Sequence, residues 1–359
     1  MKAAVCRAFG APLRIEDVDL DPPERGEVGV RVKACGICQS DLHYLAGAWG
    51  GTLPAVYGHE AAGIVTDIGD GVLALSPGDH VVVSLIRACG RCWFCVRGDP
   101  VFCEARFRLD HKTPLRARDG AAISQGLRTG AFAEQLLVDA SQAVRIPDDV
   151  AFESACLLAC AVITGFGAAV HTAPVEPGST VVVIGAGGVG LNTVQAAALQ
   201  GASTIVAIDV VDAKLTAARA LGATDGVNPA RADPATVVHR LTQGRGADSV
   251  FVTVGSPQAA EDALALARRG GTVVLVGMPP AGGSSRMDAG AIANDGRRIL
   301  GSKMGGAHPH TDVPALLDLY RQGRLRLDEL VTRRYAFSEI NDAVRASVEG
   351  QAIRNVIVN

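Results

Sequence analysis

The chain has 359 residues, of which 48% are hydrophobic and 20% charged, and its formal net charge is -3. This length suits about two domains, and the near balance of charge excludes the basic footprint of a nucleic-acid-binding protein. The N-terminal segment lacks the apolar core of a signal peptide, and no run approaches the roughly 20 apolar residues of a membrane span. We therefore expect a cytoplasmic protein with no nucleic-acid or membrane partner. Its 9 cysteines should bind metal or stay free rather than form disulfides.

The first 150 residues are rich in valine-bearing alternating runs, such as EVGVRVKAC and GHEAAGIVTDIG, interrupted by glycine and proline. Alternation of apolar and polar residues is the period of a β-strand. This region is therefore predicted to be a β-rich domain.

The sequence carries two sets of possible metal ligands. The first is local: CGRCWFCVRGDPVFC carries Cys89, Cys92, Cys95 and Cys103. Four thiolates this close in sequence can close a tetrahedron around zinc and leave no position open, which is typical of a structural site. An iron–sulfur cluster or a loop of reduced thiols are the alternatives.

The second set is dispersed, and it consists of Cys35 and Cys38, His59 in the tripeptide GHE, and Cys156 and Cys160. Two cysteines and one histidine with an open fourth position describe a catalytic zinc. The spacing does not choose between the first two cysteines, and a cysteine in the apolar run ACLLACAV also suits a small buried residue.

From residue 155 to 304, apolar strands alternate with alanine-rich helical segments. The strands are VVVIGAG, STIVAID, DSVFVTVG and TVVLVG, and the helices include NTVQAAALQG, DAKLTAARALG and PQAAEDALALARR. This order predicts right-handed βαβ crossovers and a parallel sheet. The tail from residue 305 holds two helical segments and a closing strand near residues 355–358, and we expect it to pack on the first region.

The first of these strands runs into a glycine-rich turn, VVVIGAGGVG. Gly185, Gly187 and Gly190 give the spacing G-x-G-x-x-G, in which a helix N-terminus faces a pyrophosphate. Gly188 and Val189 complete the turn. Asp209 ends the second strand, where a carboxylate binds ribose hydroxyls and repels a 2′-phosphate. The pattern therefore predicts a nicotinamide dinucleotide site that prefers NAD to NADP.

The order of these motifs resembles the zinc-containing alcohol dehydrogenases of the medium-chain dehydrogenase/reductase superfamily. The resemblance rests on ACGICQSDLH, GHE, CGxCxxCxxGxPxxC, Cys160 before TGFG, GxGxxG with Asp209, and AIRNVIV. It implies an α/β protein in two domains. Residues 1–161 and 305–359 would form a GroES-like β-rich catalytic domain with a structural zinc lobe at about 86–110, and residues 162–304 an inserted Rossmann NAD-binding domain.

The resemblance also implies ligands and roles. The catalytic zinc ligands would be Cys38, His59 and Cys160, which leaves Cys35 and Cys156 as bystanders and gives two zinc ions per chain.

Four further residues would act around this zinc. Glu60 would lie beside the metal and exchange with water there, and Asp41 would orient the histidine ligand. Ser40 would touch the zinc-bound oxygen, and His43 would stand at the solvent end of a proton relay through Ser40 and the nicotinamide ribose, unless it is an ordinary surface histidine. Lys214 and Arg354 would contact the adenosine side and the pyrophosphate.

Matching the family's pocket positions places Trp49, Leu85, Gly126 and Leu127 around the substrate. No charge falls among them, and Gly126 is expected to leave space where relatives carry a ring. We therefore expect primary alcohols or aldehydes with medium-sized apolar or aromatic groups. Arg106 or Arg108 would change this if either turned in to bind a carboxylate. A departure from many relatives is Gln39, which stands where they place a cation against the pyrophosphate.

The expected activity is NAD-dependent hydride transfer between a primary, or secondary, alcohol and its aldehyde or ketone. Within this class, oxidation of a hydroxymethyl-thiol adduct and a permanently bound cofactor recycled by a second substrate are alternatives. Outside it, the alternatives are a zinc-free relative that keeps the fold and a redox sensor using Cys35 and Cys38.

We also expect a homodimer joined through sheet edges at TVVLVGM and RRILGSKM.

Overall fold

The computed structural model describes all residues from Met1 to Asn359, and its contacts divide the chain into two compact units. Unit 1 comprises Met1–Ala161 and His308–Asn359, and unit 2 comprises Val162–Ala307. The second boundary therefore lies at residue 308, against the 305 expected from the sequence. No single helix is long and apolar enough to cross a membrane.

Unit 1 is built mainly of strands, as the alternating valine runs indicated. A closed barrel is formed by β1 (Lys2–Cys6), β2 (Arg14–Leu20), β7 (Leu115–Ala117), β8 (Ala122–Gln125) and β4 (Ala55–Val56). A second sheet has the order β10 (Ala143–Arg145), β6 (His80–Val83), β5 (Glu60–Ile68), β3 (Glu27–Gly36), β18 (Arg354–Val358) and β17 (Val331–Ala336), with β9 (Gln135–Asp139) also on β3. Its helices are α1 (Gln39–Leu45), α2 (Trp93–Val96), α3 (Phe152–Ala155), α10 (Pro309–Arg321) and α11 (Ile340–Val348).

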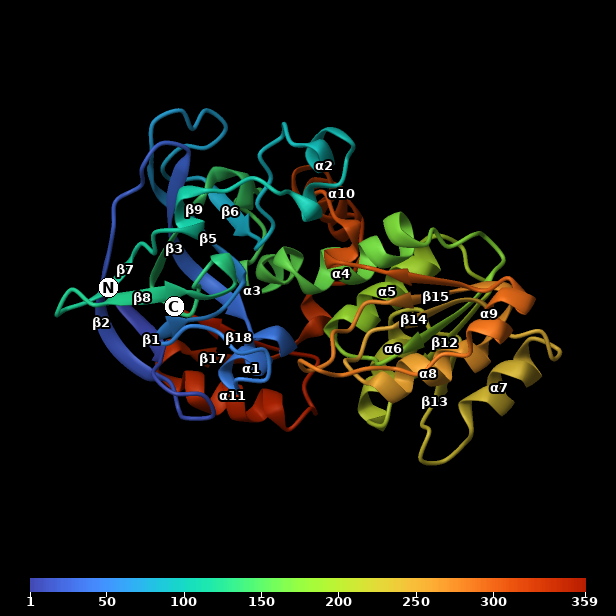
Figure 1. Ribbon diagram of the computed structural model, residues 1–359. Helices are drawn as coiled ribbons and strands as arrows, with labels where there is room; N and C mark the ends of the chain where they lie inside the picture. The colour runs from blue at the N-terminus through green and yellow to red at the C-terminus, as the bar shows by residue number, and fades with distance from the viewer. The chain divides into compact units, whose positions relative to one another are not determined.

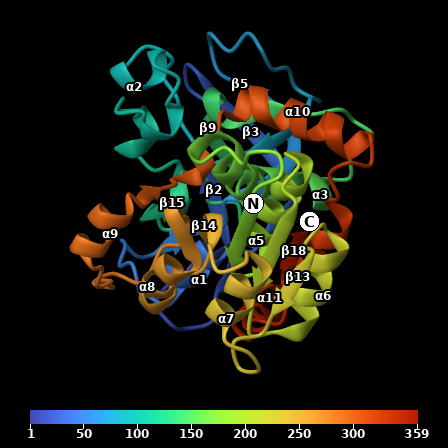
Figure 2. The same cartoon turned by 90° about the vertical axis from the view of Figure 1, so that its right-hand side faces the viewer.

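The two ends of the chain meet inside unit 1. Strand β18 pairs antiparallel with β3, with Val356 opposite Gly36 and Ile357 opposite Cys35, and the red and blue strands lie side by side in Figure 1. The C-terminal tail therefore completes the sheet that carries the dispersed metal donors, which confirms that it packs on the first region. The short helix α2 lies in a lobe that stands out from these strands (Figure 2).

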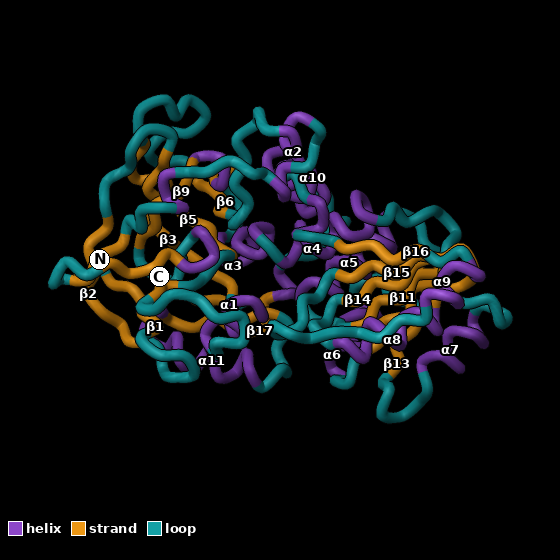
Figure 3. Tube along the Cα trace, viewed as in Figure 1, coloured by secondary structure: helices purple, strands orange, loops and turns teal.

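Unit 2 is a six-stranded parallel sheet flanked by helices, as the alternation of strands and helices predicted (Figure 3). The strand order is β13 (Asp225–Val227), β12 (Thr204–Ile208), β11 (Thr180–Ile184), β14 (Ala247–Val252), β15 (Ala267–Leu275) and β16 (Arg298–Gly301). The helices are α4 (Ala161–Gly167), α5 (Gly188–Leu199), α6 (Asp212–Ala220), α7 (Pro234–Leu241), α8 (Pro257–Leu266) and α9 (Ala289–Asp295). Four of the strands are the four apolar runs of the sequence.

The sequence analysis did not identify β13, α7 or α9. Strand β13 is only 3 residues long, and α9 buries none of its residues, so neither shows an apolar pattern. Helix α7 does carry a start signal, because Asp233 accepts hydrogen bonds from the backbone N–H groups of Ala235 and Thr236 and Pro234 follows it. This N-cap was readable from the sequence and was missed.

Candidate metal centres and dinucleotide-binding turn

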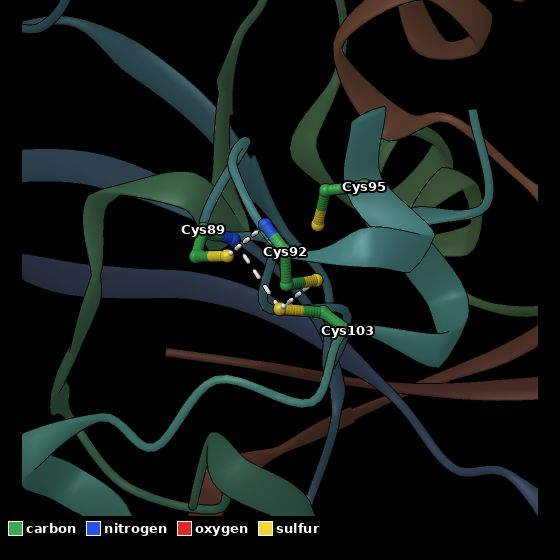
Figure 4. Close-up of side chains that lie close together, drawn as sticks. All are labelled: Cys89, Cys92, Cys95 and Cys103. Carbon is green, nitrogen blue, oxygen red and sulfur yellow. Dashed lines mark hydrogen bonds between the residues drawn. The ribbon is translucent and has the colours of Figure 1, made fainter. Parts of the chain in front are cut away.

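The four-cysteine lobe lies between β6 and β7, and its sulfur atoms gather in one space (Figure 4). The ligand atoms of Cys89, Cys92, Cys95 and Cys103 all lie within 4.8 Å of one another. Backbone N–H groups support the sulfurs: that of Cys92 lies 3.3 Å from the Cys89 Sγ and that of Cys89 lies 3.4 Å from the Cys103 Sγ. Four soft donors at this separation fit a closed tetrahedral zinc site.

A second cluster is fully buried, and it joins parts of unit 1 that are far apart in sequence. It consists of Cys38, His59, Glu60 and Cys160, whose ligand atoms also lie within 4.8 Å of one another. Cys38 is the N-cap of α1, His59 and Glu60 stand at the start of β5, and Cys160 ends the short turn before α4. The fold therefore brings together the three ligands and the acid that the resemblance implied.

Asp41 determines how His59 is held. Its carboxylate, completely buried, accepts hydrogen bonds from the backbone N–H groups of Cys38 (3.1 Å) and Gly58 (2.9 Å), and lies 3.0 Å from the His59 Nδ1. With Nδ1 donating to this carboxylate, the Nε2 lone pair of His59 is free. That Nε2 is buried and has no hydrogen-bond partner in the protein, which fits the role of a metal ligand.

Glu60 is held by Arg354 rather than by solvent. The Arg354 Nη2 donates to the Glu60 Oε1 at 2.9 Å, and its Nη1 lies 3.3 Å from the carbonyl oxygen of Ile37. Burial raises the pKa of Glu60 to about 7, although the Arg354 charge opposes this. The Glu60 Oε2 is buried and unpaired, and one carboxylate oxygen of Glu60 lies within 4.8 Å of the other ligand atoms of the cluster. The family resemblance implied only a pyrophosphate contact for Arg354, and the sequence gave no sign of this ion pair.

The two thiols of the cluster, Cys38 and Cys160, differ in pKa. The hydrogen bond from Cys160, with the nearby Arg354 charge, holds the pKa of Cys38 well below its usual value, while the same hydrogen bond and burial hold the pKa of Cys160 well above it. Cys35 and Cys156 lie outside the cluster, and their sulfurs face the carbonyl oxygens of Gly36 and Glu153. The thiolate character of Cys38 and the unpaired donors around it therefore fit a bound zinc ion.

The expected relay residues lie on α1, directly after Cys38. The Ser40 Oγ is 3.9 Å from the Cys38 Sγ, and His43 stands one turn further along the helix. Burial lowers the pKa of His43, which keeps its imidazole neutral at pH 7. The His43 ring lies 4.7 Å from the Trp49 ring, which in turn meets Tyr44 edge-on at 5.3 Å. This places one expected pocket residue, Trp49, beside His43, the histidine expected in the relay.

The expected space at Gly126 is filled. A Cβ at this glycine would lie 2.3 Å from the Tyr57 Cδ1, so the Tyr57 ring takes the place of a side chain there. The reason is tertiary, because residues 57 and 126 meet only through the barrel pairing of β4 with β8. Leu127 adopts a left-handed conformation with φ 52°, and it, Trp49 and Leu85 are all half-buried.

Arg108 is held by carboxylates. It donates to both oxygens of Glu27 at 2.6 Å and lies 3.1 Å from Glu24. It is therefore already paired in this structure, whereas Arg106 is exposed.

Arg87 anchors the loop that carries Leu127. Its guanidinium is buried and donates to Gln142 (2.6 Å), Asp110 (2.8 Å) and the carbonyl oxygen of Arg128 (3.1 Å). Replacing Arg87 by methionine should lower the free energy of unfolding by about 3 kcal/mol, because buried Gln142 and two partly buried acceptors lose their donor. Urea denaturation measures this. The control Arg145→Met removes an exposed ion pair with Asp79 and should cost less than about 1 kcal/mol; equal losses would contradict the anchoring role.

The glycine-rich turn of unit 2 joins β11 to α5 and has the geometry of a phosphate site. Gly185 has φ 95°, and a Cβ at Gly190 would lie 1.7 Å from the carbonyl oxygen of Gly185. Around Gly187, by contrast, a Cβ would meet nothing within 4 Å. The first and third glycines are thus required by the protein itself, and the second leaves its backbone open to a ligand.

Asp209 ties the next strand to this turn. Its carboxylate accepts hydrogen bonds from the backbone N–H groups of Ala186 (2.7 Å) and Val211 (2.9 Å). Each oxygen keeps a further lone pair for a ribose hydroxyl. Lys214, the expected adenosine-side residue, follows in the first turn of α6 and is half-buried.

Comparison with known proteins agrees with this geometry. Residues 24–148 match the alcohol dehydrogenase GroES-like domain, and residues 188–322 match the zinc-binding dehydrogenase family. The NDMA-dependent alcohol dehydrogenase of Amycolatopsis methanolica is 38% identical over 367 residues, covering 100% of this chain and 98% of that protein. The chain belongs to the zinc-containing alcohol dehydrogenases of the medium-chain dehydrogenase/reductase superfamily.

Solved structures of alcohol dehydrogenases share the whole fold. Benzyl alcohol dehydrogenase from Acinetobacter calcoaceticus has a TM-score of 0.93 and 33% identity, over 99% of this chain and 98% of that one. An alcohol dehydrogenase zinc-binding domain protein from Burkholderia ambifaria has a TM-score of 0.94 and 34% identity, with the same coverage. The chain is therefore an alcohol dehydrogenase in fold and family, which makes it an oxidoreductase.

Proposed function

We propose that this alcohol dehydrogenase transfers a hydride between NAD and a primary alcohol that carries a medium-sized apolar or aromatic group. The observation that carries the proposal is the buried cluster of Cys38, His59, Glu60 and Cys160. The chain also has a glycine-rich turn at residues 185–190 and Asp209 after the next strand, so it holds both parts that such a reaction needs. Two zinc ions per chain, one in each cysteine-containing cluster, belong to the same proposal.

The protein's own residues handle the alcohol proton. Cys38, His59 and Cys160 would hold a zinc ion, which would supply a Lewis acid for the alcohol oxygen. Ser40, next to Cys38, accepts the proton at its Oγ, and the neutral His43 imidazole takes it toward solvent. Asp41 keeps His59 in the tautomer whose Nε2 can bind metal, and the buried surroundings of the cluster exclude water.

The cofactor's side of the reaction rests on unit 2. NAD supplies the hydride acceptor. The open backbone at Gly187 and the N-terminus of α5 bind the pyrophosphate, and the Asp209 carboxylate binds the ribose hydroxyls. A 2′-phosphate at this carboxylate would meet a negative charge, which favours NAD over NADP.

The proposed substrate class follows from the aromatic surroundings of His43. Trp49, Tyr44 and Tyr57 form consecutive ring contacts at 5.3 and 5.5 Å. Arg108, one of the two arginines that could have bound a carboxylate, is paired with Glu24 and Glu27. Burying an apolar or aromatic group of the substrate against these rings would contribute roughly 25 cal/mol per Å² of apolar surface. The relative from Acinetobacter, named for benzyl alcohol, supports this choice.

Steady-state kinetics with purified protein tests the function. We expect NADH to form with benzyl alcohol and hexanol, at higher kcat/KM than with ethanol or a hydroxymethyl-thiol adduct, and with NAD preferred to NADP. A preference for the adduct would contradict the substrate class. Reduction of no more than about one cofactor per chain, with alcohol oxidation continuing only when a second oxidant takes the hydride from the bound NADH, would indicate a permanently bound cofactor. The NDMA dependence in the name of the Amycolatopsis relative suggests this outcome.

Asp209→Gly should narrow the NAD preference by roughly tenfold or more, because it removes both the ribose acceptor and the repulsion. The ratio of kcat/KM values for NAD and NADP is the measurement. Overall cofactor affinity should fall as well, since Ala186 and Val211 lose their acceptor. An unchanged ratio would show that Asp209 does not select the cofactor.

The proposed homodimer would use β16. This strand is at the edge of the parallel sheet, and its Ile299 and Leu300 are only half-buried. The run TVVLVGM does not offer an edge, since β15 pairs with β14 and β16 on its two sides. Of the two sheet segments expected at the interface, only RRILGSKM can therefore continue the sheet into a second copy.

A further inference from the structure

The imidazole of His43 is held by a ring contact and not by a hydrogen bond. Its ring lies 4.7 Å from the Trp49 ring, and the two planes are tilted by 31°. No group of the protein hydrogen-bonds either ring nitrogen. A histidine that moves a proton has to present one nitrogen in a fixed direction, and a carboxylate or carbonyl oxygen ordinarily fixes it. The protein places no such group at His43.

The histidine of the buried cluster shows the contrast. The His59 Nδ1 lies 3.0 Å from the Asp41 carboxylate, which fixes both the ring and its tautomer. His43 follows Asp41 by two residues on α1 and is half-buried. Without a hydrogen bond, its ring can turn about the side-chain bonds unless a neighbour restricts it. The face of the Trp49 indole is the neighbour that does so.

Trp49 is itself held by a tight loop after α1. The backbone N–H of Ala48 donates to the carbonyl oxygen of His43 at 2.9 Å, which folds the loop back onto the helix. A Cβ at Gly47 would lie 2.8 Å from the Phe9 Cγ, so only glycine lets the loop pack this closely on that ring. The loop therefore carries Trp49 in one position relative to His43.

The other side of the indole rests on the core of unit 1. Trp49 meets Tyr44 edge-on at 5.3 Å, and Tyr44 stacks on Tyr57 at 5.5 Å. Tyr57 is 3% exposed and belongs to the hydrophobic core of the unit. Packed cores resist displacement, so this row of rings supports the indole against His43.

We propose that Trp49 is a positioning residue of the proton relay, whose indole ring holds the His43 imidazole in the orientation that receives the proton from Ser40. The ring contact does for His43 what the Asp41 carboxylate does for His59. The inference rests on the proposed function, because Trp49 acts through His43 and does not touch the transferred proton. Trp49 was also expected beside the substrate, so the experiment has to separate the two roles.

A double-mutant cycle separates them. We would measure kcat/KM for benzyl alcohol with NAD in the wild type, Trp49→Leu, His43→Gln and the double variant. Trp49→Leu should lower kcat/KM by about five- to tenfold when His43 is present, because a displaced base takes its proton less efficiently. In the His43→Gln background the same change should cost less than about twofold, since no imidazole is left to position. A residue that only lines the pocket would cost the same in both backgrounds.

Two further variants add readouts that a structural role would not move. Trp49→Phe keeps an aromatic face against His43 and should stay within about twofold of the wild type. In Trp49→Leu the solvent deuterium isotope effect on kcat/KM should rise toward that of His43→Gln, because proton transfer then limits the rate more. The matched control is Trp93→Leu, which removes a tryptophan that is 59% exposed and contacts Arg97. It should leave kcat/KM and the isotope effect at their wild-type values.

Several outcomes would overturn the positioning role. They are equal losses from Trp49→Leu in the two backgrounds, a loss in Trp49→Phe as large as in Trp49→Leu, and an unchanged isotope effect. A Trp49→Leu protein that does not fold would show that the ring supports the fold and not the histidine. Failure of the proposed function looks different, because no variant, nor the wild type, would then oxidise the alcohol. Full activity in His43→Gln would remove His43 from the relay and this inference with it.

Discussion

Cys38→Ser should lower kcat/KM for alcohol oxidation by roughly a thousandfold, because the Lewis acid of the buried cluster loses a thiolate ligand. Metal analysis of the same sample should show a fall from about two zinc ions per chain to about one. The remaining ion belongs to the four-cysteine lobe, whose ligands do not include Cys38. The variant should therefore stay folded.

Cys35→Ser is the matched control. Cys35 lies three residues earlier and is also buried, but its sulfur faces the carbonyl oxygen of Gly36 outside the cluster. This variant should keep both zinc ions and most of the activity. The opposite result, with activity lost in Cys35→Ser and kept in Cys38→Ser, would reverse the ligand assignment. If both variants kept full activity, neither cysteine would be a ligand of the catalytic zinc.

Arg354→Met should lower the free energy of unfolding by about 3 to 5 kcal/mol, because it leaves Glu60 buried without its partner. The ion pair joins the first residue of β18 to the first residue of β5, at 2.9 Å. Both side chains are almost fully buried, at 8% and 0% exposure, so water cannot replace the lost donor. Urea denaturation measures the change.

A double variant tells whether the loss comes from Glu60. Arg354→Met combined with Glu60→Gln removes the unpaired charge, so it should be more stable than Arg354→Met alone. The resemblance to the family assigns Arg354 to the pyrophosphate instead. That role predicts a different result for Arg354→Met. If that contact were its main role, NAD affinity would fall while stability stayed at the wild-type value.

The local motifs were predictable because their chemistry lies within a short stretch of chain. Four cysteines between residues 89 and 103 cannot lie far apart, whatever the rest of the fold does, and the structure gathers their sulfurs within 4.8 Å. The glycine-rich turn is equally local, since an apolar strand, three glycines and a helix specify their own geometry. Asp209 follows from the next strand of the same βαβ unit.

The buried cluster was predictable only through resemblance to a known family. Spacing alone left Cys35 and Cys38 equal, and the fold separates them by placing the first on β3 and the second at the N-cap of α1. His59 and Cys160 join Cys38 through the packing of strand ends and turns far apart in the chain. Contacts between residues so far apart along the chain leave no periodic pattern in the sequence.

Two features were decided by the tertiary structure alone. The Arg354–Glu60 ion pair spans 294 residues and exists because β18 returns to pair with β3 beside β5. The Tyr57 ring fills the space at Gly126 because β4 and β8 are neighbours in the barrel. The sequence by itself determined the donor types, the dinucleotide turn and the alternation of elements, since these depend on neighbours along the chain. Which buried groups face one another depends on strand pairing across the whole of unit 1, and only the folded chain sets that pairing.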